Sequence, residues 1–125
     1  MKPFELQKAI YTKLDAALSV PVYDDVPQGA SYPYVVIGED ATIEWDTDTE
    51  IGSESTLTIH TWSRAAGRKQ TKELQEAIYT ALHRTALVVT GVDVITCTHE
   101  FSESFMDPDG ETRHGVSRYR VLIEL

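Results

Sequence analysis

The feature that most constrains the fold is a proline–glycine turn near the C-terminal end, set between two long runs of β-strand character. Asp107-Pro108-Asp109-Gly110 places proline at the first corner, where its ring fixes φ, and glycine after it, where a positive φ is needed. In the run that follows, apolar and charged side chains alternate, which predicts one buried and one wet face. The apolar set is Tyr119, Val121, Ile123 and Leu125, and the charged set is Arg118, Arg120 and Glu124. The pattern predicts two antiparallel strands near 92–106 and 113–125.

Two strands are indicated in the N-terminal half. A short one is expected near Val22-Tyr23, inside a connector over 20–33 whose three prolines confine it to an edge or a strand start. Residues 34–38 form a nearly continuous apolar run, which predicts a buried strand. This strand is expected to extend to Trp45, with a bulge or bend at Gly38.

The clearest strand covers residues 55–62, where Leu57 and Ile59 alternate with polar and β-branched side chains. Residues 46–54 are polar and acidic. We therefore expect them to form a loop that joins this strand to the preceding one.

Two helices complete the pattern. Apolar residues recur at spacings of three and four over 3–19 and again over 66–84, so each segment has one apolar stripe. The resulting order is α-β-β-β-α-β-β. It predicts an α+β fold in which two helices pack on one face of a mostly antiparallel sheet, as a single domain over 1–125.

Charge excludes several classes of function. The 125 residues include 20 acidic and 11 basic side chains, for a formal charge of −9. This balance argues against a nucleic-acid binder, which would usually be basic, and against docking on an anionic membrane. A single cysteine excludes a disulfide scaffold, and no apolar run approaches the ~20 residues of a membrane span. The N-terminal residues lack a signal peptide's apolar stretch, so we expect a cytosolic protein or part of a particle assembled in the cytosol.

The chain offers one weak candidate for a reactive site and no motif of a known catalytic class. Cys97 and His99 lie two positions apart on one predicted strand, with Glu103 further along. An enzymatic or ligand-binding module built on them would need a thiol of depressed pKa. No second ligand pair stands nearby to complete a zinc site, so no metal or cofactor is expected. The interpretation we favour is a buried, inert thiol beside a strand histidine.

Charged residues cluster in two places that suit protein interfaces better than catalysis or metal binding. Asp46-x-Asp48-x-Glu50 resembles the front of a calcium loop, but Ile51 and Leu57 occupy the positions that need glycine and a bidentate glutamate. Such a loop could instead meet the basic start of the second helix in an identical neighbour, a head-to-tail contact that can close into a ring. The residues expected at interfaces are Asp46, Asp48, Glu50, Glu54, Arg64, Arg68, Lys69, Asp107, Asp109 and Arg113.

Several short motifs follow one another along nearly the whole chain. They are VYDDVPQGA at 22–30, YPYVVIG at 32–38, LTIHTWSR at 57–64, GRK at 67–69, DPDG at 107–110, HGV at 114–116 and RYR at 118–120. Each motif alone is weak evidence of a family. In this order and spacing the chain resembles the small phage tail-completion proteins, also called tail terminators.

The resemblance implies a virion structural protein of a long-tailed phage, a prophage or a gene transfer agent. Such proteins form a six-membered ring on the head-proximal end of the tail tube, which stops tube polymerisation and offers a surface to the head-completion connector. The implied partners are further copies of this chain, the major tail tube protein and the connector protein. DNA would pass through the ring without sequence-specific contacts, and no membrane partner is expected.

The family has no catalytic motif to transfer, so the resemblance implies a protein that is not an enzyme. The implied location is the neck region of the virion, after assembly in the bacterial cytoplasm. Two alternatives stay open at this point: a non-phage adaptor of similar α+β build, and the module based on Cys97 and His99.

Overall fold

The computed structural model describes residues 3–46 and 51–124. Within them, two helices and five strands follow in the order α-β-β-β-α-β-β, which confirms the predicted α+β class. The helices are α1 (Pro3–Ala17) and α2 (Lys69–Leu82). The strands are β1 (Val22–Tyr23), β2 (Tyr34–Asp46), β3 (Ile51–Ser63), β4 (Asp93–Met106) and β5 (Arg113–Glu124).

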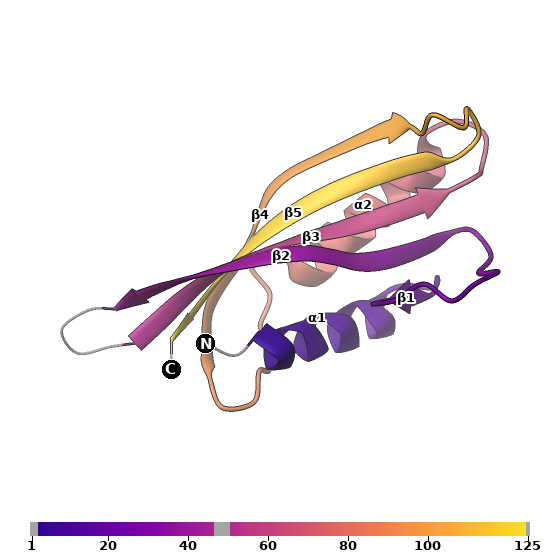
Figure 1. The fold of residues 1–125 in the computed structure, drawn as a ribbon. Coiled ribbons are helices and arrows are strands. Elements are labelled where there is room, and N and C mark those ends of the chain that lie inside the picture. The colour runs from indigo at the N-terminus through magenta and orange to yellow at the C-terminus, as the bar shows by residue number, and fades with distance from the viewer. Residues whose placement is uncertain (1–2, 47–50, 125) are drawn as a thin grey trace.

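The strands form one sheet in the order β1-β2-β3-β5-β4. All pairs are antiparallel except β1 with β2, which pair in parallel at the sheet edge, where the prolines of the connector predicted a short strand. Both helices lie on the same side of the sheet (Figure 1). We call the side without helices the open face.

The core lies between the helices and the covered face of the sheet. The helices contribute the apolar stripes that the sequence spacing predicted, and the sheet contributes alternate residues of its central strands. The helix residues buried there include Leu6, Ile10, Leu14, Ile78 and Leu82, and the strand residues include Val35, Ile37, Leu57, Ile59, Cys97, Tyr119 and Val121. Because successive strand residues point to opposite sides, the residues between them line the open face.

The helices are shorter than the expected 3–19 and 66–84. Helix α1 ends at Ala17, although the Leu18 amide still donates to the Leu14 carbonyl oxygen at 2.9 Å. Helix α2 begins at Lys69 because Gly67 adopts φ +79°, a left-handed conformation that a right-handed helix cannot include.

The expectation of a loop over 46–54 was wrong for its described residues. The β2–β3 ladder continues to Asp46 opposite Ile51, and Glu54 pairs with both Ile43 and Leu122. Neighbouring β5 supplies hydrogen-bonding partners to β3 as far as Gly52, so polar residues of low strand propensity are held in the sheet by tertiary pairing. Residues 47–50, which include Asp48 and Glu50, lie outside the described part of the chain.

This extension produces a projecting arm. We use the term for residues 43–46 of β2 and 51–54 of β3. In Figure 1 these ends of β2 and β3 reach beyond the start of α1, whereas the β4–β5 turn and the start of α2 lie at the other end of the molecule.

Local irregularities in the strands follow the expectations in part. The β2–β3 register shifts between Ile37 and Asp40, which confirms a bulge around Gly38. Two shifts in the β4–β5 pair, between Val94 and Thr96 and between His99 and Phe101, were not predicted. In the β4–β5 turn, Gly110 has φ +71° and its amide donates to the Asp107 carbonyl oxygen at 2.9 Å, as the proline–glycine signal predicted.

Candidate interaction surfaces

The structure does not assemble the candidate thiol site. Cys97 is fully buried under the helices, and this burial raises the pKa of its thiol to about 11, the opposite of the depressed value a reactive thiol needs. His99 Nε2 lies 2.8 Å from Ser102 Oγ instead of being directed at the thiol. The prediction of an inert buried cysteine is therefore the one that agrees with the structure.

The bulge after His99 also separates Glu103 from this pair. Cys97 pairs with Val121, which is buried on the covered face. Glu103 instead pairs with Val116 of β5. Val116 lies five positions before Val121, and because this number is odd, Val116 and its partner Glu103 lie on the open face. A regular strand would have kept all three side chains on one side. The extra residue in β4 reverses the alternation beyond it.

No group of three or more His, Cys, Asp or Glu side chains within residues 3–46 and 51–124 is placed to hold a metal ion. Among the same residues, no helix is both long and apolar enough to cross a bilayer.

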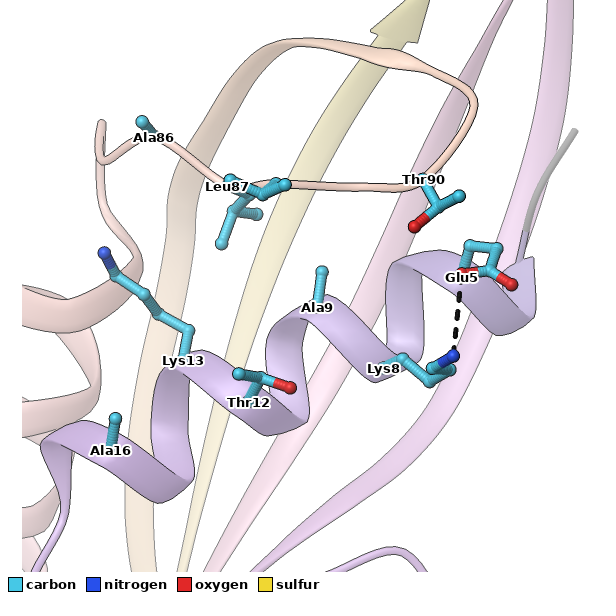
Figure 2. Close-up of a pocket in the computed structure, with 10 residues that line it drawn as sticks. Glu5, Lys8, Ala9, Thr12, Lys13, Ala16, Ala86, Leu87 and Thr90 are labelled. Carbon is cyan, nitrogen blue, oxygen red and sulfur yellow. Dashed lines mark ion pairs between the residues drawn. The ribbon is translucent and has the colours of Figure 1, made fainter.

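A groove of about 480 Å³ runs between α1 and the segment 86–90 (Figure 2). Small side chains of α1, such as Ala9, Thr12 and Ala16, form one wall, and Leu87 lies on the other. Its charged groups are Lys13 and the surface pair Glu5–Lys8, whose carboxylate oxygen and Nζ are 3.9 Å apart. The groove thus lacks a nucleophile with an adjacent base, and it fits packing better than catalysis.

On the open face, two histidines and two carboxylates form a chain across four segments. His60 Nδ1 on β3 lies 2.6 Å from His114 Nε2 on β5, and His60 Nε2 lies 2.5 Å from Glu39 Oε1 on β2. At the other end, His114 Nδ1 is 3.7 Å from a carboxylate oxygen of Asp107 in the β4–β5 turn. Trp62 stacks on the His114 ring with centroids 3.8 Å apart. No local sequence pattern indicates this set of side chains, because only the β3–β5 register brings residues so far apart in sequence together.

The histidine chain has clear electrostatic consequences. The hydrogen bond from His60 lowers the pKa of the Glu39 carboxyl, while burial, aided by repulsion from His60, lowers the pKa of His114. The arrangement therefore favours a charged Glu39 on one side of His60 and a neutral His114 on the other. We regard this set of side chains as a structural link that joins β2, β3 and β5 to the β4–β5 turn.

The residues expected at interfaces separate into two poles of the molecule. Asp46 and Glu54 belong to the arm, where Glu54 faces Arg120 at 3.6 Å. The remaining described members gather at the opposite end, around the β4–β5 turn and the start of α2 (Figure 1). They are Arg64, Arg68, Lys69, Asp107, Asp109 and Arg113.

Several residues of this second pole have structural roles inside the chain. Arg64 Nε donates to Thr112 Oγ1 at 3.2 Å, and its guanidinium lies 4.4 Å from the centroid of the Tyr32 ring. Asp109 accepts hydrogen bonds from the Glu111 amide and from the amide and hydroxyl of Thr112, which lower its pKa to about 2. Lys69 faces Glu73 one turn later on α2, at 3.8 Å.

Comparison with known proteins agrees with this geometry. The family model for the tail completion protein gp17 matches residues 8–124. The chain belongs to this family. The tail completion protein gp17 of Bacillus phage SPP1 is 27% identical over 92 residues, which span 74% of this chain and 68% of that protein. The resemblance inferred from the ordered motifs is thereby confirmed.

Two solved structures are similar to this member of the tail completion family. A chain in the virion of a native gene transfer agent particle superposes with a TM-score of 0.86, at 24% identity, over 96% of this chain and 95% of that one. The structure of the bacteriophage SPP1 gp17 protein matches with a TM-score of 0.60, at 26% identity, over 93% of this chain and 86% of that one. The first likeness is one of fold.

Proposed function

We propose that the chain is a virion structural protein that caps the head-proximal end of a phage-like tail tube, stops its polymerisation and joins it to the head connector. The observation that carries this proposal is the family match over 8–124. It is supported by the likeness in fold to a chain of a gene transfer agent virion, with a TM-score of 0.86. The proposed location is the neck region of the particle, after assembly in the bacterial cytoplasm.

The proposed unit is one domain over 1–125 that acts without catalysis. The buried state of Cys97 supports this view, because it removes the candidate nucleophile from solvent. The groove beside α1 supports it as well, since its lining lacks a nucleophile–base pair.

The proposed partners are further copies of the chain in a ring, the tail tube protein and the head connector. The two poles of the molecule support self-association. An arm with exposed Glu44 and Asp46 lies at one end, and Arg68 and Lys69 lie exposed at the other. Contacts between unlike surfaces of identical chains are heterologous, and they close into a ring when the rotation per subunit allows.

Electron microscopy of particles from a strain that lacks the gene tests the proposed role. The expected result is tails of uncontrolled length that are not attached to filled heads, with normal particles restored by a plasmid-borne copy. Normal particles without the gene would exclude the proposed function.

A second experiment addresses the acidic residues that the sequence predicts at an interface. Reversing the charges of Asp46, Asp48 and Glu50 is expected to weaken assembly while the fold persists. A triple Asn/Gln variant serves as the matched control, because it removes the charges without introducing repulsion. Unchanged assembly and tail morphology with the reversed charges would exclude these three residues from the interface.

A further inference from the structure

A small pocket opens between the start of α2 and the turn end of the β4–β5 hairpin. Its volume is about 90 Å³, and it is lined by Arg68, Thr71, Ser104, Phe105, Met106 and Arg113. Arg113 lies on the covered face of the sheet because it pairs with buried Ser63 on one side, and with Met106 on the other. Two guanidinium groups therefore approach one pocket from different elements.

Both arginines lack a carboxylate partner within the described residues 3–46 and 51–124. No ion pair joins Arg68 or Arg113 to these residues, although Arg120 and Lys69 each have one. The two aspartates of the adjacent turn are already engaged, Asp107 near His114 and Asp109 with Thr112. In a chain of net charge −9, two unpaired arginines at one pocket are a local site for an anionic group from outside.

Thr71 adds an unused hydrogen-bonding group. The residue lines the pocket, is 1% exposed, and its hydroxyl has no hydrogen-bond partner within the described chain. Helix α2 also begins without a side-chain cap, so the amide groups of its first turn are available to an acceptor. A buried hydroxyl without a partner is costly, and a bound carboxylate would satisfy it.

Edge strand β4 ends beside the pocket with one exposed apolar side chain on each of its faces. Met106, which is 41% exposed, lies on the covered face with Arg113. Phe105, which is 44% exposed, lies on the open face, where its ring centroid is 4.9 Å from that of His114. The pocket thus combines two cations and a free hydroxyl with exposed Met106, while Phe105 is exposed on the opposite face of the same strand end. A segment with a carboxylate next to an exposed apolar residue is complementary to it.

The arm of this chain has that composition. Ile43 is 66% exposed, and Glu44 and Asp46 follow as exposed carboxylates. The arm lies at the opposite end of the molecule from the start of α2 and the β4–β5 turn (Figure 1), which flank the pocket, so the arm can meet this pocket only on a different copy. Glu44 and Asp46 lie on one face of the arm and Ile43 on the other, because Glu44 pairs with buried Ser53 and Ile43 with Glu54. We propose that the arm of one copy docks at the Arg68–Arg113 pocket of the next, with Glu44 or Asp46 on the arginines and Ile43 on the opposite face, against Phe105. This inference rests on the self-association in the proposed function and names the contact that makes it.

Cysteine cross-linking tests the contact directly, because native Cys97 is buried and does not compete. The variant with Ile43→Cys and Phe105→Cys in one chain is expected to oxidise into a ladder of covalent oligomers. The matched control carries Ile43→Cys with Val88→Cys, since Val88 is 92% exposed but lies outside the pocket. The assay is carried out on the concentrated purified chain and, separately, on particles in which the variant replaces the parent chain completely. Equal yields from both variants would overturn the proposal.

Charge exchange provides the second readout. In the cross-linking background, Arg113→Asp and Asp46→Arg are each expected to lower the yield by about tenfold, and the double variant to restore most of it. Thermal unfolding of each variant establishes that it folds. Single reversals without effect would overturn the pocket contact. The proposed tail role would still stand if deletion of the gene gave unattached tails, so the two failures are distinguishable.

Discussion

His60 Nδ1 on β3 and His114 Nε2 on β5 lie 2.6 Å apart on the open face of the sheet. At this distance, one ring nitrogen donates a proton and the other accepts it, so at least one ring must be neutral. Glu39 and Asp107 hold the outer nitrogens, which links β2 and the β4–β5 turn to the pair. The β4–β5 turn is thus connected to the centre of the sheet.

Acidification is the first condition expected to loosen this connection. Burial lowers the pKa of His114 in the folded chain, so below pH ~6.5 the unfolded chain binds more protons at this site. The free energy of unfolding is therefore expected to fall as the pH drops through this range toward the lowered pKa. Glu39, whose pKa is also lowered, contributes stability that is lost only at pH values below its ordinary 4.5.

Urea unfolding at pH 7.5 and 5.5 measures the effect of His114. The His114→Gln variant, which cannot be protonated, should show a smaller loss of stability between the two values. An equal pH dependence in the variant and the parent chain would contradict a role for His114.

Gly115 is expected to tolerate no side chain. A Cβ atom there would lie 2.2 Å from Thr61 Oγ1 and 2.9 Å from Thr71 Cγ2, under the start of α2. Gly115→Ala should therefore lower the free energy of unfolding by about 1–3 kcal/mol through overpacking. Adding Thr61→Ala removes the nearest atom and should recover part of the loss in a double-mutant cycle. Strict additivity of the two changes would argue against the predicted clash.

Asp109 is expected to maintain the β4–β5 turn through its acceptor oxygens. Asp109→Ala removes three hydrogen bonds from Glu111 and Thr112, whereas Asp109→Asn keeps one oxygen as an acceptor. We expect the alanine variant to unfold at a lower temperature than the asparagine variant, and both below the parent chain. Hydrogen exchange at the Thr112 amide reports on the turn itself. Equal protection in all three chains would contradict this role.

Cys97 is expected to react only when the chain unfolds. Its burial and its pKa of about 11 leave almost no accessible thiolate at neutral pH. Alkylation by iodoacetamide should be negligible in buffer and should follow the unfolding transition as urea is added. Rapid modification of the native chain at pH 7.5 would contradict this prediction and would support a reactive thiol at Cys97.

The sequence alone was sufficient for the element order and the layering, because the helix stripes and the alternation around the 107–110 turn are local signals. It was insufficient for the arm, since Glu54 and its polar neighbours become strand only through pairing with β5. The bulge after His99 also has no local signal, yet it moves Glu103 to the opposite face from Cys97.

The structure locates the described residues predicted at interfaces without testing their contacts. The grouping of six of them at the β4–β5 turn end depends on tertiary structure, which places Arg64 against Thr112 and Arg113 beside the start of α2. Charge counting could not separate Asp109, which is engaged within its own turn, from Arg68, which lacks an ion-pair partner among the described residues. The contact between copies stays a prediction for each of them.

The most direct test of the central claim is cryo-electron microscopy of intact particles that carry the chain. The account predicts a ring of copies at the head-proximal end of the tail tube, with the fold of Figure 1 fitting the density and neighbouring copies in contact. Absence of the chain from the particle, or its location at the distal tip of the tail, would contradict the account.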